Sequence, residues 1–321
     1  MIKTTRKRRL SIGFRLLLIV LILLLSGGIW QNEMMKVEFR KYLPKGQIYQ
    51  INSHDIHLYG VGQGESTIVF ISGSGTPSAF TDFYYLQNEL QPYSRTVSYD
   101  HAGFGWSEKT NIPRTIDIVV EELHELLQKA GEQAPYILVG HSLASLETIR
   151  YAQKYPDEVK GIILLDSGSP EYYAKESEMK SYLINRIFAG FRVTGVVRAL
   201  GTFGVLLPFT GENIRNQSLP NEIKGMDVAM YYNHIGESNN LNAIRNMNEN
   251  AQSVIEGGYL KDIPLLILSS DSGSDWEEVQ KELLHWSDES RQETLPDSEH
   301  YIHWSNREAV LEKILEMVKL N

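Results

Sequence analysis

The sequence predicts an α/β fold, with a mostly parallel central sheet, helices on both faces and an inserted helical cap. Short apolar runs of strand length alternate with longer segments of helical periodicity between about residues 50 and 170, and the pattern resumes near residue 260. Between them, residues 171–259 are rich in Asn, Gly and Tyr and show helical pieces without a convincing strand. That length exceeds an ordinary connection, so we expect a helical lid there.

The first part of the predicted core covers residues 50–170. Strands are expected at Ile56–Tyr59, Thr67–Ile71, Thr96–Tyr99, Tyr136–Val139 and Gly161–Leu165. Helices are expected where apolar residues recur at helical spacing, from Ile116 to Gly131 and from Leu143 to Tyr155 before Pro156. Buried strands and helices in this order predict parallel pairing.

The second part of the predicted core covers residues 260–321. A strand is expected at Ile263–Leu268. Ser305 and Glu308 have the spacing of a capping box, which predicts the start of a last helix.

Composition sets the class of protein. The chain has 321 residues, of which 42% are hydrophobic and 22% charged, so it can bury a large core. It contains no cysteine, which excludes disulfides, thiolate metal sites and a cysteine nucleophile. From residue 16 onward there are 25 basic and 40 acidic residues, and an acidic body without a basic stripe predicts no nucleic-acid binding.

Residues 1–32 form a predicted targeting segment. Residues 1–15 hold six basic residues and no acidic ones, and the ten apolar residues Leu16–Leu25 follow. The bases should stay on the cytoplasmic side, so the body is expected outside the cytoplasm. Residues 14–30 could remain as a single anchor in the cell membrane, or cleavage near Ser26 and Gly28 could release a secreted protein. A buried core helix is a third alternative, which the basic cluster disfavours.

We expect a nucleophilic serine in Gly140-His141-Ser142-Leu143-Ala144, which lies between a predicted strand and a predicted helix. A sharp turn at this place lifts a serine hydroxyl above the sheet edge, and small residues flank it because the backbones crowd there. Ala144 stands where the pattern G-x-S-x-G has its last glycine. A helix-capping serine without a catalytic role is the structural alternative.

With these residues the sequence resembles the α/β-hydrolase superfamily over most of residues 55–320. Ser72-Gly73-Ser74-Gly75 is similar to its oxyanion loop, and Asp100–Ser107 matches its D-x-x-G-x-G-x-S turn. The resemblance implies that the backbone N–H groups of Leu143 and Ser74 form an oxyanion hole. It also implies Ser142 as nucleophile and a triad in the order serine, acid, histidine.

The base implied by the resemblance is His300, within Asp297–His303 between the last strand and the last helix. Glu299 stands where the family pattern G-H-x-x-H has a glycine. His303 is expected to make only backbone hydrogen bonds at the helix entry. The acid is either Asp166, at the end of Gly161–Leu165, or a residue after Ile263–Leu268, where Asp271 and Asp275 fit loosely. We favour Asp166.

These residues predict a serine hydrolase that cleaves a carboxylic ester, or an amide or lactone, through an acyl-enzyme. No cofactor is implied, and no metal is expected because histidines such as His54 and His57 lack ligand partners in the sequence. The lid residues Phe188, Phe191, Phe203 and Phe209 favour an apolar substrate, unless they form the lid core. A haloperoxidase-like enzyme without cofactor and a non-catalytic binding or sensing protein remain alternatives. The oligomeric state is not predicted.

Overall fold

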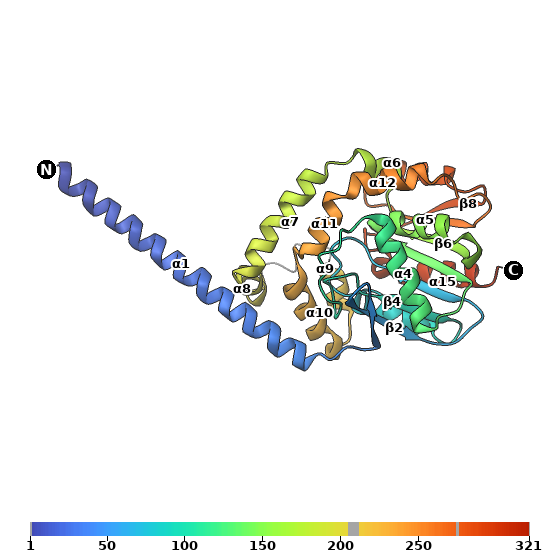
Figure 1. The fold of residues 1–321 in the computed structure, drawn as a ribbon, viewed down its shortest axis with the longest axis horizontal. Helices are drawn as coiled ribbons and strands as arrows, with labels where there is room; N and C mark the ends of the chain where they lie inside the picture. The colour runs from blue at the N-terminus through green and yellow to red at the C-terminus, as the bar shows by residue number, and fades with distance from the viewer. Residues whose placement is uncertain (1, 205–211, 274–275, 321) are drawn as a thin grey trace.

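An eight-stranded sheet organises the computed structural model, which describes residues 2–204, 212–273 and 276–320 (Figure 1). The strands lie in the order β1-β2-β4-β3-β5-β6-β7-β8. β2 runs antiparallel to β1 and β4, and every other neighbouring pair is parallel. The strands are β1 Gln47–Ile51, β2 His54–Val61, β3 Thr67–Ile71, β4 Arg95–Tyr99, β5 Tyr136–His141, β6 Val159–Leu165, β7 Leu265–Ser270 and β8 Ser290–Leu295.

This architecture confirms the predicted fold class, and each predicted strand overlaps an observed one. β3 has the predicted bounds, because its five residues are all buried and form one apolar run. The two strands at the sheet edges, β1 and β8, were not predicted. β8 is half-exposed and mostly polar, so it lacks the pattern by which buried strands are recognised.

Helices cover both faces of the sheet, as predicted. α4 (Ile116–Ala130) and α5 (Ser145–Lys154) pack on one face, where Val69 and Leu138 point. α3 (Tyr84–Leu90) and α15 (Arg307–Val318) pack on the other, where Phe70 and Val139 point. Because alternate side chains of a strand face opposite ways, the same strands supply both cores.

The start of the last helix differs from the prediction. α14 (Ile302–Ser305) precedes α15, and Asn306 lies at the N-cap of α15 without a capping side-chain hydrogen bond. The hydroxyl of Ser305 instead accepts a hydrogen bond from the backbone N–H of Glu299 at 2.9 Å. The predicted capping box is therefore wrong, because Ser305 serves the loop that carries His300.

In the described part of residues 170–256, seven helices follow β6 and form the cap, and there is no strand. They are α6 Pro170–Lys175, α7 Glu178–Val193, α8 Val196–Thr202, α9 Glu212–Ser218, α10 Asn221–His234, α11 Ser238–Arg245 and α12 Met247–Glu256. α6 and α12 pack against each other, and α12 also contacts α4 and α5 of the core. Asn240 and Met247 of the cap line a pocket together with residues that follow β3, β4 and β5, so the cap lies at the carboxyl ends of these strands.

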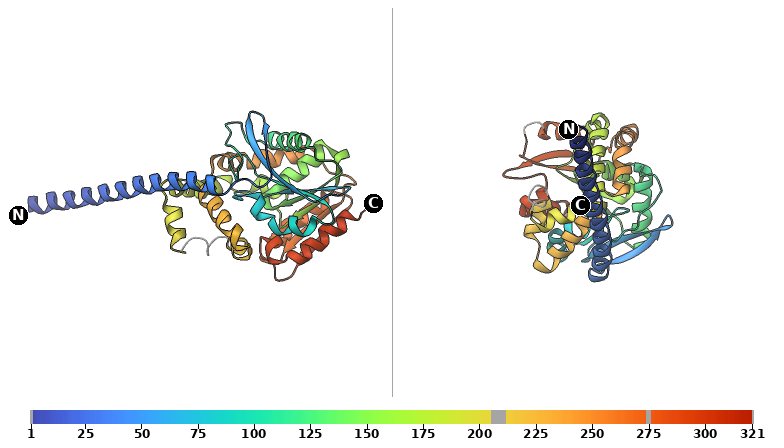
Figure 2. Two further views of the ribbon diagram at one scale, coloured as in Figure 1. Left: turned by 90° about the horizontal axis from the view of Figure 1, so that it is seen from below. Right: turned by 90° about the vertical axis from the view of Figure 1, so that its left-hand side faces the viewer.

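The N-terminal segment is one long helix, α1 (Ile2–Lys41), which projects from the body (Figures 1 and 2). Its second half packs on α7, α8 and α10 of the cap. Arg198 of α8 holds Glu38 of α1 through two hydrogen bonds of 2.5 and 2.8 Å, and its Nε donates to Gln31 at 2.7 Å. A helix of this length and composition could cross a membrane from Ile12 onward.

Candidate active site

Ser142 lies on a strained turn between β5 and α5. It opens the short 3₁₀ helix η1 (Ser142–Ala144), and its φ of 55° is in the left-handed region that side-chain-bearing residues seldom adopt. A side chain at Gly140 would place a Cβ 2.7 Å from Cγ2 of Thr148, so β5 and α5 approach closely there. Ala144 is buried in this junction. This geometry is that of the predicted nucleophile turn.

The structure brings Ser142, His300 and Asp166 together. His300 Nε2 lies 3.2 Å from Ser142 Oγ, across 158 positions of sequence. Its Nδ1 lies 2.7 Å from Asp166 Oδ2. The three side chains thus form one hydrogen-bonded chain at the carboxyl ends of β5 and β6.

Asp166 is buried and fully hydrogen-bonded. Its Oδ1 accepts from the backbone N–H of Ser270 and from Gln280 Nε2, both at 2.8 Å, and its Oδ2 accepts from Trp276 Nε1 at 3.0 Å as well as from His300. Burial alone would raise the pKa of this carboxyl, but the hydrogen bonds from His300, Ser270 and Gln280 outweigh it and lower the pKa. Asp166 is therefore held as a carboxylate facing the imidazole.

The ring nitrogens of His300 meet Asp166 and Ser142, and Asp271 has other partners. The two oxygens of Asp271 accept from the backbone N–H groups of Asp297 and Ser298, each at 2.9 Å. Asp271 thus ties β7 to the loop that precedes His300. Asp275 and Phe209 lie outside the described residues.

The loop of residues 72–75 lies against the nucleophile turn. A Cβ built on Gly73 would be 3.2 Å from Cβ of Ser142, so only glycine allows this approach without displacement. Ser74 is held to the cap through a 2.9 Å hydrogen bond from its Oγ to Asn240 of α11. Ser74 and Leu143, whose backbone N–H groups are the predicted oxyanion-hole donors, both line the same pocket.

This pocket lies between the core and the cap. Its walls are mostly apolar and include Phe104, Ile116, Leu146 and, from the cap, Met247. The lid phenylalanines do not line it among the described residues: Phe188 packs within the cap, and Phe191 and Phe203 are exposed. The apolar character of the pocket therefore comes from residues other than those predicted.

Three residues at the site were not found from the sequence. Trp276 and Gln280, on α13 (Trp276–Lys281), donate to Asp166. Tyr173, on α6, is buried, which raises the pKa of its phenol, and its hydroxyl contacts both the backbone N–H of Gly168 and the side chain of Ser142. No local motif marks these positions.

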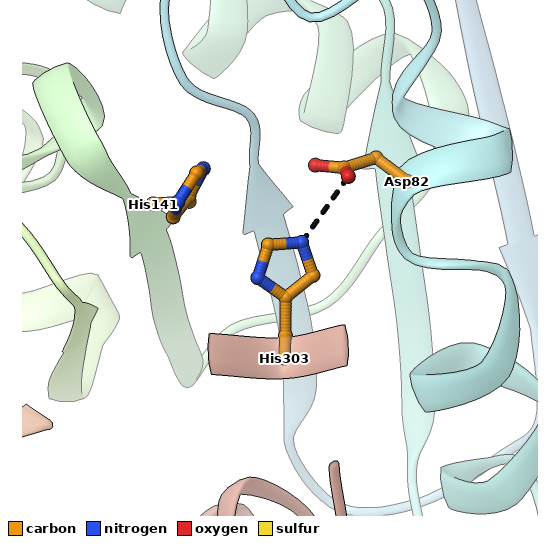
Figure 3. A group of neighbouring side chains, drawn as sticks. All are labelled: Asp82, His141 and His303. Carbon is orange, nitrogen blue, oxygen red and sulfur yellow. Dashed lines mark hydrogen bonds and ion pairs between the residues drawn. The ribbon is translucent and has the colours of Figure 1, made fainter. Parts of the chain in front are cut away.

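A second group of buried polar side chains is formed by Asp82, His141 and His303 (Figure 3). Contrary to expectation, His303 bonds to a side chain: its Nε2 is 3.1 Å from Asp82 Oδ1. His141 Nε2 is 3.0 Å from the backbone oxygen of His300, so the cluster is joined to the loop that carries His300. Burial would raise the pKa of Asp82, but His303 and Arg215 hold it below its ordinary value.

Asp82, His141 and His303 are metal-ligand types, with donor atoms within 4.8 Å of one another. However, Nη1 of the buried Arg215 lies 3.5 Å from Asp82 Oδ1, and Nε of the same guanidinium pairs with Asp227 Oδ1 at 2.7 Å. A cation between these groups would face the guanidinium at close range. The cluster is better described as an ion-pair network than as a metal site.

The fold and this geometry define the class of protein. A model of the family described as alpha/beta hydrolase fold matches residues 67–307, so the chain belongs to that family. Membership in it supports hydrolase chemistry on a small-molecule substrate.

Among curated relatives, the Uncharacterized protein YbdG of Bacillus subtilis (strain 168) is 28% identical over 258 residues, covering 79% of this chain and 77% of that one. The crystal structure of an enol-lactonase from Burkholderia xenovorans LB400 aligns with a TM-score of 0.65 at 16% identity, covering 85% of this chain and all of the other. An esterase from Thermogutta terrifontis aligns with a TM-score of 0.65 at 19% identity, covering 85% and 97%. At these identities the structural likeness shows the fold alone.

Proposed function

We propose that this protein is a membrane-anchored serine hydrolase that cleaves a carboxylic ester through an acyl-enzyme. The observation that carries the proposal is the chain of two hydrogen bonds from Ser142 through His300 to Asp166. A serine hydroxyl is a weak nucleophile at neutral pH, and a base within hydrogen-bonding distance is what activates it.

In the proposed reaction, Ser142 Oγ attacks the ester carbonyl while its proton passes to His300 Nε2. Asp166 keeps the proton of the resting imidazole on Nδ1 and stabilises the imidazolium that forms. The N–H groups of Leu143 and Ser74 stabilise the tetrahedral oxyanion. His300 then protonates the departing alcohol, and water activated by the same imidazole hydrolyses the acyl-enzyme.

The pocket favours an ester with an apolar acyl or alkyl group. Phe104, Leu146 and Met247 line it and make most of its surface apolar, while the ionisable side chains of Arg114 and Glu147 also border it. An amide or a lactone would pass through the same tetrahedral intermediate. The esterase and lactonase of the same fold are consistent with acyl-transfer chemistry on this scaffold.

We further propose that α1 stays attached as the anchor and that the body lies on the extracytoplasmic side. An 18-residue window of α1 has a mean hydropathy of 2.5 and none of it is buried in the protein. The helix continues without interruption past Ser26 and Gly28 and binds the cap through Gln31 and Glu38. These contacts favour a retained helix over a cleaved signal.

A fluorophosphonate probe tests the proposal, because it reacts only with an activated serine. We expect the full-length protein to be labelled, Ser142→Ala to be unlabelled, and Ser74→Ala to be labelled, since that change keeps the backbone N–H. Hydrolysis of p-nitrophenyl esters of increasing chain length then measures substrate preference. Absence of labelling in the folded protein would instead favour a binding or sensing role.

A further inference from the structure

The cap carries an apolar surface on its outside, which we call the α7–α8 face. Its side chains come from α7 and α8 and from the residue after α8, and all are exposed: Leu183, Ile184, Ile187, Phe191, Leu200 and Phe203. Phe203 is 81% exposed. On a helix at the surface of a water-soluble body the polar side faces outward, so α7 shows the reverse of the expected pattern. Several large apolar side chains exposed on two neighbouring helices point to an interaction site.

The position of α1 identifies the partner of this face. Gly27 and Gly28 of α1 lie against the turn between α7 and α8: a Cβ at Gly27 would be 2.3 Å from the backbone oxygen of Thr194, and one at Gly28 would be 3.0 Å from that of Val193. The apolar run Leu16–Leu25 ends just before these two glycines. Along the axis of α1, the turn between α7 and α8 therefore lies just beyond the end of the apolar run Leu16–Leu25.

Figures 1 and 2 show how this level relates to the body. α7 crosses α1 rather than running along it, and α7 and α8 form the side of the body that faces the free N-terminal half of α1. When the apolar half of α1 is placed in a bilayer, this side meets the membrane surface. Trp30 of α1 and the exposed Lys180 and Arg186 of α7 are residue types that favour the boundary between lipid and water.

We propose that the α7–α8 face lies in the lipid interface of the membrane that holds α1, so that α7 is an interfacial helix. The inference rests on the membrane anchoring proposed above. The arrangement fixes the height of the cap, and with it of the pocket beneath α11, at the membrane surface. Arg198 stabilises it, because the same side chain joins α8 to Glu38 of α1.

The chain has no cysteine, so single-cysteine variants can be labelled with an environment-sensitive fluorophore at one chosen site. Full-length protein would carry the label at Ile187 or Phe191 on the α7–α8 face, at Leu21 in α1, or at Tyr93, an exposed residue of the core. Each is reconstituted into vesicles of phosphatidylcholine and phosphatidylglycerol, with and without brominated acyl chains that quench on contact.

We expect brominated lipid to quench the Ile187→Cys, Phe191→Cys and Leu21→Cys labels and to leave the Tyr93→Cys label bright. Quenching at position 21 alone would overturn the inference and leave the anchor standing. A different result would point to a second copy of the chain as the partner of the α7–α8 face. In that case brominated lipid would not quench the labels at 187 and 191, their emission would report shielding from water, and dilution with unlabelled protein would change it. This result would also overturn the inference. Absence of quenching at 21 would overturn the proposed anchor and this inference together.

Discussion

Replacing Asp166 with asparagine tests the site most sharply, because the structure fixes how the amide must lie. The carboxylate receives four donors, and an asparagine has only one acceptor oxygen. The backbone N–H of Ser270 and the side chain of Gln280 keep that oxygen on their side. The new NH₂ group then faces Trp276 and His300.

Two consequences follow from this orientation. His300 Nδ1 must accept a hydrogen bond from the amide, so its proton moves to Nε2, which can no longer take the proton of Ser142. The equivalent acid-to-amide change in a well-studied Ser-His-Asp protease lowers turnover by about 10⁴-fold, and we expect a loss of that order. The N–H of Trp276 also loses its acceptor, which should cost about 1–3 kcal/mol of folding stability.

Asp271→Asn is the matched control, since Asp271 is the other carboxylate that the sequence offers. It removes the charge from two backbone hydrogen bonds, one exposed and one partly buried, and touches neither Ser142 nor His300, so activity should fall by no more than about tenfold. The rate constant for fluorophosphonate labelling and the turnover of a p-nitrophenyl ester are measured for both variants, with thermal unfolding as a check on folding. Equal losses in the two variants, or near-normal activity in Asp166→Asn, would refute the assignment.

Three further predictions concern the scaffold. Gly105→Ala should destabilise the protein by more than about 2 kcal/mol in urea unfolding, because Gly105 has a φ of 51° and its Cβ would lie 1.9 Å from Asp100 Oδ2. Burial would raise the pKa of Asp100, but hydrogen bonds, first of all the one from His57, lower this pKa below its ordinary value of 3.8. The carboxylate therefore stabilises the fold above pH 3.8, and this stabilisation should be lost as the pH falls below that value. Urea unfolding measured at several pH values tests this. Glu38→Gln breaks a largely buried ion pair with Arg198 and should loosen α1 from the cap by about 3 kcal/mol, which limited proteolysis after residue 28 can detect as faster cleavage.

How far the sequence predicts the fold depends on how local the determining forces are. β3 was predicted to the residue because burial on both faces leaves a continuous apolar run. β8 was missed because an edge strand with a wet face is recruited by pairing with β7, and pairing leaves no pattern in its own sequence. Ser305 and Glu308 have the spacing of a capping box, but the hydroxyl of Ser305 accepts its hydrogen bond from the backbone N–H of Glu299, in the preceding loop, instead.

The site divides in the same way. Ser142 and His300 lie in short motifs whose spacing is set by a turn, so local sequence is enough to propose them. The choice between Asp166 and Asp271 depends on which carboxylate the ring of His300 meets across the ends of β6 and β7, a relation between distant segments. The hydrogen-bond donors to Asp166 come from two side chains of α13 and from the backbone of β7. A backbone N–H can be donated by almost any residue type, so the sequence does not reveal it. A catalytic acid can therefore be proposed from sequence, whereas the electrostatic environment that keeps it charged comes only with the packed sheet edge.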